Sequence, residues 1–75
     1  MPENGDVVIR HHVREGRRVF AMHTVPGPEQ CVLRSQDDAV RQAVVFAKRE
    51  QVRVWSIDDG AGFVLLKDFR RVKPV

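Results

Sequence analysis

One segment of this 75-residue chain, residues 35–51, has the residue spacing of an amphipathic helix and lies between two stretches with strand-like composition. Its apolar residues recur at intervals of three and four positions, which places them on one helical face. They are Ala39, Val40, Ala43, Val44 and Ala47, with Phe46 at the margin. Ser35 is a favourable N-cap residue, and Asp37 and Asp38 follow it where the helix dipole favours negative charge. The sequence therefore predicts one helix that covers one face of a sheet.

Two strands joined by a tight turn precede the helix. Residues 7–13 and 18–25 are rich in β-branched and aromatic side chains, which favour strands. Between them, residues 14–17 include Gly16, which can adopt a positive φ angle in a turn. We therefore predict a hairpin. The two prolines that follow require a loop, and residues 30–34 are predicted as a short third strand.

A second hairpin follows the helix, because residues 52–58 and 63–69 flank an Asp-Gly dipeptide, a strong hairpin signal. We therefore predict an α+β fold, an antiparallel sheet of four to five strands with one helix packed on one face. Its order along the chain is strand, strand, short strand, helix, strand, strand. A chain of this size has room for a single core, so one domain is expected over residues 1–75, with frayed ends at 1–6 and 70–75.

The length of the first turn decides which side chains of the first hairpin face the helix. A two-residue turn at Glu15 and Gly16 groups alternate residues of the two strands on one face. This face carries Val7, Ile9, His11 and Val13 together with Thr24, Met22, Phe20 and Arg18. A three-residue turn shifts the pairing by one residue and brings His23 and Ala21 to that face instead. We favour the two-residue turn because it places the bulky Phe20 and Met22 opposite the helix.

The chain contains one cysteine, Cys31, so it forms no internal disulfide and suits a reducing compartment. Its first residues lack the basic segment and apolar run of a signal peptide, and no uncharged stretch reaches membrane-spanning length. We therefore expect a cytoplasmic protein that makes no membrane contact. A domain this small has a small core, and oligomerisation is the expected source of additional burial.

Three histidines and Cys31 raise the question of a metal site, because zinc binds nitrogen and sulfur ligands. In the favoured register His23 lies opposite Val8, four positions from His12, a separation of roughly 13 Å that is too long for one shared ion. The shifted register brings His11 and His23 into diagonal contact and leaves a metal site as the less favoured alternative. We predict no metal and no cofactor.

The other reactive groups favour structural roles. A lone cysteine in an apolar strand is typical of a small buried side chain, and Asp58 and Asp59 precede a glycine as turn residues do. For Trp55, the single tryptophan, core packing is favoured over stacking on a nucleobase. No nucleophile, base and orienting group can be assembled from this sequence, so we predict no catalytic residues and no enzymatic activity.

The last predicted strand has apolar side chains on both of its faces, because alternate residues of a strand point to opposite sides of a sheet. The run consists of Phe63, Val64, Leu65 and Leu66. One side can pack against the helix, whereas the other side needs a partner in a small antiparallel sheet. We predict a homodimer that forms through these residues or through the outer face of the sheet.

Residues 19–50 carry a local resemblance to a known family. A strand at residues 19–22 (Val-Phe-Ala-Met) is followed by a Val-Pro-Gly-Pro loop, a short strand, and a helix that opens at residues 35–39 (Ser-Gln-Asp-Asp-Ala). This order resembles the HicB-like antitoxin group and related small bacterial domains of unknown function. The resemblance implies a domain similar to part of a double-stranded RNA-binding fold. It also implies, for full-length members, a separate DNA-binding segment and the neutralisation of a toxin.

Two functions follow from these features. We predict a small non-enzymatic protein-interaction or regulatory module whose partner is a second copy of the chain or another protein. The alternative is a protein that binds RNA or DNA through a basic sheet edge and the C-terminal tail. The net charge of +3 permits contact with a polyanion. The candidate contacts are Arg10, Arg17, Arg18, Arg70, Arg71 and Lys73.

Overall fold

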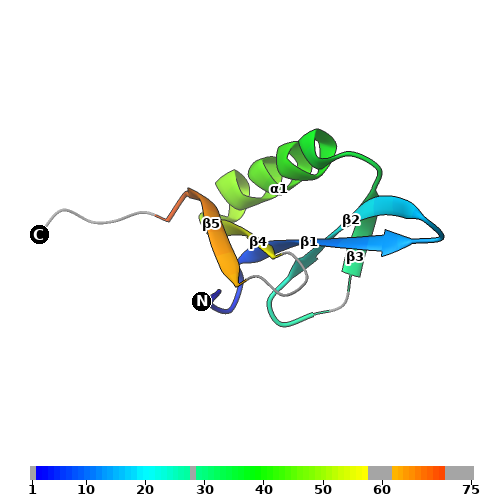
Figure 1. The fold of residues 1–75 in the computed structure, drawn as a ribbon. Coiled ribbons are helices and arrows are strands. Elements are labelled where there is room, and N and C mark those ends of the chain that lie inside the picture. Colours follow the sequence, from blue (N-terminus) through cyan, green and yellow to red (C-terminus); the bar gives the residue numbers. More distant parts are fainter. Residues whose placement is uncertain (1, 28, 58–61, 71–75) are drawn as a thin grey trace, which may run out of the picture.

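The computed structural model describes residues 2–27, 29–57 and 62–70, with the backbone alone for residues 29–31. This part of the chain contains one helix and five strands (Figure 1). In chain order they are β1 (Val7–Arg14), β2 (Arg17–Thr24), β3 (Glu29–Leu33), α1 (Gln36–Glu50), β4 (Arg53–Ile57) and β5 (Phe63–Asp68). The α+β class, the single helix and the order of the elements along the chain are confirmed.

The five strands form one mixed sheet, in the spatial order β3-β2-β1-β4-β5. The two predicted hairpins are present, because β1 pairs with β2 and β4 pairs with β5, both in the antiparallel sense. At the centre, however, β1 and β4 are parallel neighbours, with Val7 beside Val54 and Arg10 beside Ile57. The prediction of a purely antiparallel sheet is therefore wrong, and the strands do not lie side by side in chain order.

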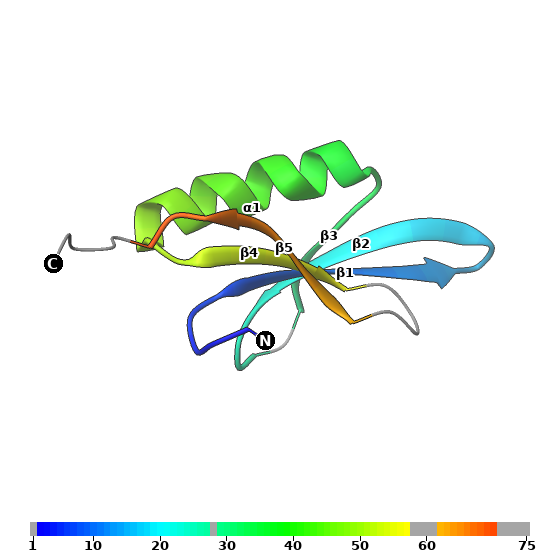
Figure 2. The same cartoon turned by 60° about the vertical axis from the view of Figure 1, so that its left-hand side comes forward.

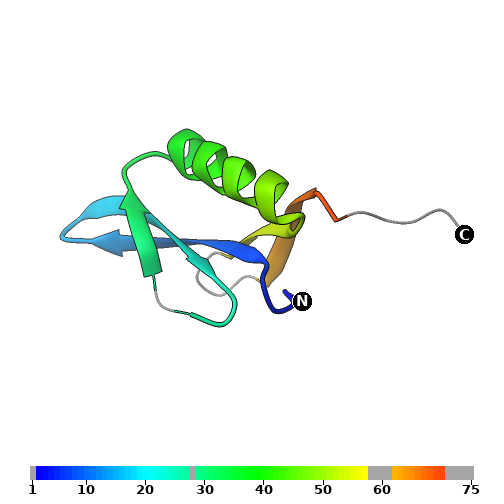
Figure 3. The same cartoon turned by 180° about the vertical axis from the view of Figure 1, so that it is seen from behind.

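The helix is the physical reason for the parallel pair. β2 runs against both β1 and β3, so β3 has the same direction as β1. α1 then carries the chain back across one face of the sheet, and β4 starts again in the direction of β3 (Figures 1 and 3). A helical crossover of this kind is the usual link between parallel strands. β4 pairs along β1, the central strand of the sheet. Val7, Val8 and Ile9 of β1 are all buried, as expected for a strand at the centre of a sheet.

The first hairpin has the favoured register. Val7 pairs with Thr24, Ile9 with Met22, and His11 with Phe20. The turn between the strands consists of Glu15 and Gly16, both with positive φ angles, of 50° and 74°. Positive φ at both central positions defines the type I′ turn, whose twist suits a two-residue hairpin.

α1 packs against β1, β2, β3 and β4 and covers one face of the sheet (Figure 3). Ser35 is its N-cap as predicted, and its hydroxyl accepts a hydrogen bond of 3.1 Å from the backbone N–H of Asp38. Ala39, Ala43 and Ala47 are fully buried against the core of the sheet. Three alanines four positions apart bring the helix backbone close to the strands. α1 is the one helix in the described part of the chain, and it is not long and apolar enough to cross a membrane.

The alanine row predicts a strict volume limit at the interface of helix and sheet. We expect Ala43→Leu to lower the free energy of unfolding by about 1 to 3 kcal/mol, because the added atoms have no space in a close-packed core. Val45 lies on the exposed side of α1, so Val45→Leu should change it by less than about 0.5 kcal/mol. Urea denaturation of both variants measures the difference, and equal midpoints would contradict a close helix-to-sheet contact.

Candidate functional site

The strand predicted to mediate dimerisation, β5, lies at one edge of the sheet. Two successive apolar residues of this strand are exposed, Val64 by 55% and Leu65 by 46%. They point to opposite faces, since Val64 pairs with Ser56 on the helix side and Leu65 pairs with Trp55 on the outer side. An edge strand with an apolar side chain exposed on each face is a ready surface for association.

The other two candidate residues of β5 are more enclosed. Phe63 is half-buried, and its ring meets the Trp55 ring edge-on at 6.4 Å between centroids. Leu66 is half-buried and packs against the core. The register between β4 and β5 shifts at this point, so that Leu66 is an extra residue between the pairs formed by Leu65 and Lys67. A bulge of this kind changes the direction of a side chain. Here the extra residue, Leu66, packs against the core, and Val64 and Leu65 remain exposed to solvent.

The basic candidate residues do not gather at one place. Arg10, Arg17 and Arg18 belong to the β1–β2 hairpin. Arg70 follows the end of β5, beside the start of β4 and far along the strand direction from the hairpin turn. Arg71 and Lys73 lie outside the described residues. The described candidates therefore occupy opposite ends of the sheet.

Arg70 is also paired within the chain. Its guanidinium donates hydrogen bonds to both carboxylate oxygens of Asp68, with Nη2 2.9 Å from Oδ2 and Nε 3.1 Å from Oδ1. These side-chain hydrogen bonds lower the pKa of Asp68 and raise that of Arg70. Because the carboxylate already neutralises it, Arg70 contributes less to a polyanion-binding surface than an unpaired arginine does.

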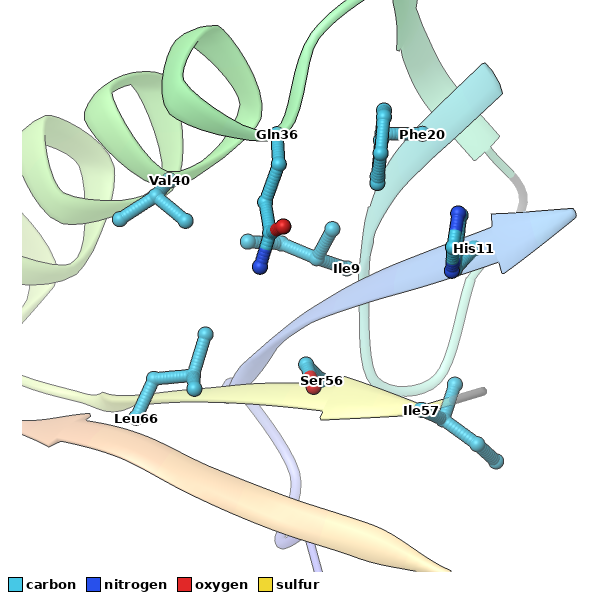
Figure 4. A pocket seen from close by; sticks show the side chains of 8 residues that line it. All are labelled: Ile9, His11, Phe20, Gln36, Val40, Ser56, Ile57 and Leu66. Carbon is cyan, nitrogen blue, oxygen red and sulfur yellow. The ribbon is translucent and has the colours of Figure 1, made fainter. Parts of the chain in front are cut away.

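A pocket of about 230 Å³ opens between the first turn of α1 and the sheet. Its walls combine apolar side chains with polar groups, and its polar side chains come from the helix start and from two neighbouring strands (Figure 4). The lining residues are Ile9, His11, Phe20, Gln36, Val40, Ser56, Ile57 and Leu66. The rings of His11 and Phe20, which both line the pocket, stack in parallel with their centroids 4.6 Å apart. Among the described residues, no aspartate, glutamate, lysine or arginine lines this pocket.

The histidines take the positions of the favoured register. His11 lies on the helix side of the sheet and His12 on the outer side, as adjacent strand residues must. His23 pairs with Val8, and one of its ring nitrogens, Nδ1, lies 3.2 Å from the carbonyl oxygen of Thr24. In the described part of the chain, no three histidine, cysteine, aspartate or glutamate residues come together as a metal site. The side chain of Cys31 and the predicted turn residues Asp58 and Asp59 lie outside the described residues.

The most highly organised polar group in the structure is Asp6, which directly precedes β1 and is 3% exposed. One of its carboxylate oxygens, Oδ2, accepts hydrogen bonds from Nε of Arg53 at 3.0 Å and from the indole N–H of Trp55 at 2.9 Å. The backbone N–H groups of Glu3 and Arg53 donate to the same carboxylate. The guanidinium of Arg53 also lies over the Trp55 ring, 4.9 Å from its centroid. This cluster, Glu3, Asp6, Arg53 and Trp55, is called the carboxylate clamp below.

The clamp settles the role of Trp55. Trp55 is 7% exposed, its N–H is bound to Asp6, and Arg53 covers its ring. Core packing is therefore confirmed for this side chain, and it is not available to stack on a base. Next to the clamp, Gly5 donates a backbone hydrogen bond to Val25 and Asp6 accepts one from it. The fraying expected over residues 1–6 and 70–75 stays a prediction.

Burial alone raises the pKa of Asp6, but the hydrogen bonds from Glu3, Trp55 and Arg53 outweigh it, so the pKa lies below the ordinary value. Sequence reasoning missed this residue. The available signal was indirect: a tryptophan in a buried strand needs an acceptor for its N–H, and a neighbouring arginine needs a counter-charge.

Comparison of the chain with protein-family models, with curated proteins and with solved structures gives no match. The resemblance to HicB-like antitoxins thus stays a prediction, and the functional argument depends on the geometry of the chain itself.

The clamp predicts a large loss of stability on neutralisation of Asp6. In Asp6→Asn the Arg53 side chain, which is 11% exposed, loses the closer of its two carboxylate partners, and the exposed Glu3 remains 3.5 Å from its Nη2. Because the hydrogen bonds to the buried carboxylate are weakened as well, the change should cost about 1 to 3 kcal/mol of unfolding free energy. Asp68→Asn removes the exposed partner of Arg70 and should leave the urea midpoint close to that of the wild type. Similar midpoints for the two variants would contradict the clamp.

The lowered pKa of Asp6 also predicts a dependence of stability on pH. The folded state holds the ionised carboxylate, so its contribution is complete at pH values above the ordinary pKa of 3.8. The contribution is lost as the pH falls through the lower pKa of the folded state. Urea denaturation at a series of acidic pH values should show this loss in the wild type. Asp6→Asn should show a smaller acid-induced decrease, and parallel curves for the two proteins would contradict the prediction.

Proposed function

We propose that this chain is a small, non-enzymatic protein-interaction module that forms a homodimer through β5. The observation that supports this proposal most directly is the exposure of Val64 and Leu65 on opposite faces of an edge strand. Isolated exposed apolar residues are common on protein surfaces, but two neighbours on an edge strand combine apolar area with open backbone hydrogen-bonding groups.

A second copy of the chain is a suitable partner for this edge. In an antiparallel β5–β5 pair related by a two-fold axis at Val64, Phe63 of each copy lies opposite Leu65 of the other. The paired segment is then entirely apolar. Lys67 and Asp68 of the two copies lie beyond it, at opposite ends of the pair, so like charges are kept apart. The result is a continuous sheet of ten strands in which β5 is no longer an edge.

The position of α1 also favours association at this strand. The helix packs against β1 to β4 and leaves the helix-side face beside Val64 exposed. A chain of 75 residues without a disulfide gains from any burial that a partner adds. The non-enzymatic character of the proposal is consistent with the use of Asp6, whose two carboxylate oxygens are occupied by donors from the protein and thus serve the fold.

Light scattering coupled to size-exclusion chromatography tests the dimer. The wild type should elute with the mass of a dimer at high micromolar protein concentration, and Val64→Lys/Leu65→Lys should elute as a monomer. The introduced lysines place two positive charges per copy at the paired edge, where burial without a partner is unfavourable.

Val45→Lys is the matched control, because Val45 is 62% exposed on α1 and lies away from β5. It adds the same kind of charge and should leave the dimer intact. A monomeric wild type at that concentration would refute the proposal, and loss of the dimer in Val45→Lys would refute the assignment to β5.

A further inference from the structure

The β1–β2 hairpin continues beyond the rest of the sheet. β4 pairs with β1 only as far as Arg10, and β3 pairs with β2 only from Phe20 onwards. Residues 12–19 therefore form a two-stranded ribbon without a flanking strand in the described part of the chain, closed by the turn at Glu15 and Gly16. Figure 2 shows this ribbon reaching past the helix and the other strands. We call residues 12–19 the arm.

The arm and its base carry the charge excess of the whole chain. Residues 10–18 include four arginines and a single acidic residue, Glu15. Their formal charge is +3, which equals the net charge of the protein. The remaining residues are balanced between basic and acidic side chains. A charge that is concentrated on a projecting element produces a strong local field and attracts a polyanion to that element.

Two arginines of the arm face each other directly. Arg14 pairs with Arg17 next to the turn, on the face of the ribbon that points away from the helix side. The two guanidinium groups therefore lie close together on one face of the ribbon, where charge-assisted hydrogen bonds to one phosphate can come from both. Arg18 lies on the opposite face, paired with Val13, so the arm presents guanidinium groups on both sides.

From this shape and charge we infer that the arm is a binding element for double-stranded DNA and enters its major groove. The B-DNA major groove is about 12 Å wide and 8.5 Å deep, and it admits a two-stranded β-ribbon. The arm has three residue pairs beyond the sheet, which is roughly 10 Å of strand, before the turn. Guanidinium groups on both faces can then contact the phosphates of both groove walls.

The charges around the arm favour DNA contact at its tip over contact at its base, on the side of the sheet that carries the helix. Asp37 and Asp38 in the first turn of α1 place negative charge there and repel phosphate. Single-stranded nucleic acid is a poorer match, because such sites stack bases on exposed aromatic rings and Trp55 is enclosed in the carboxylate clamp. Duplex RNA is also a poorer match, since its major groove is deep and narrow.

The inference does not depend on the β5 dimer and is tested separately, by fluorescence anisotropy with a labelled DNA duplex over a range of salt concentrations. If the three arginines of the arm, Arg14, Arg17 and Arg18, each contact a phosphate, the affinity of the wild type for the duplex should fall roughly 40-fold between 50 and 200 mM salt. In Arg17→Gln/Arg18→Gln one contact remains, and the affinity should fall only about fourfold over the same range, from a weaker starting value. Far-UV circular dichroism verifies that each variant is folded.

Two further variants locate the site. Arg41→Gln/Arg49→Gln makes the same change in net charge on the exposed side of α1 and should bind DNA as the wild type does. Glu15→Asn removes the single acid of the arm and places the favoured Asn-Gly sequence in the type I′ turn, so it should bind more tightly. Equal losses in the two double-arginine variants, or weaker binding by Glu15→Asn, would overturn the assignment to the arm.

The identity of the nucleic acid is tested with the single strand of the same sequence, with the RNA duplex of that sequence, and with phosphatidylserine vesicles. The DNA duplex should bind most tightly of the four. No duplex binding at low salt, equal or tighter binding of the single strand or the RNA duplex, or binding of the vesicles in preference to DNA, would each refute insertion of the arm into the major groove. None of these outcomes affects the β5 dimer.

Discussion

The parallel pairing of β1 with β4 is the junction on which the rest of the structure depends. In the described part of the chain, this is the one place where the sheet formed by β1, β2 and β3 joins the β4–β5 hairpin. The carboxylate clamp lies at the start of both strands. Through Asp6 it binds the side chain and backbone of Arg53 and the indole of Trp55, and so it ties the first strand to the fourth. A buried ion pair is costly to desolvate, and here several hydrogen bonds to one carboxylate offset that cost.

The junction also determines where the two proposed surfaces lie. Because β4 pairs with one side of β1, β5 becomes an edge of the sheet and exposes Val64 and Leu65. Within the described residues that pairing ends at Arg10, so the far half of β1 continues with β2 alone there and forms the arm. One apolar edge and one basic projection thus arise from the same short parallel contact. They lie on different parts of the molecule, so self-association and anion binding need not compete for the same residues.

Local features of the sequence were sufficient for the elements, but not for their arrangement. The cap at Ser35, the alanine spacing and the turn at Gly16 act over a few residues, so the helix, its start and the first hairpin register could be predicted. The parallel pairing depends on residues far apart in the chain, and its single local sign was the buried run at residues 7–9, apolar on both faces. Arg70 follows the end of β5, so its position depends on the direction of that strand in the sheet. The sequence does not show this direction, and the separation of Arg70 from the hairpin arginines could not be predicted.

The sequence distance across the junction has a kinetic consequence. Asp6 and Arg53 are 47 positions apart, whereas the two hairpins and the helix form between near neighbours in the chain. Closing a long loop costs entropy before its contacts can form. We therefore expect the local elements to form first and the parallel pairing to form late. A chain with this arrangement reaches its native state only when the β4–β5 hairpin docks on β1. Until then the edge of β1 remains open, and we expect the β4–β5 hairpin of a neighbouring chain to be able to pair with it in place of the chain's own hairpin.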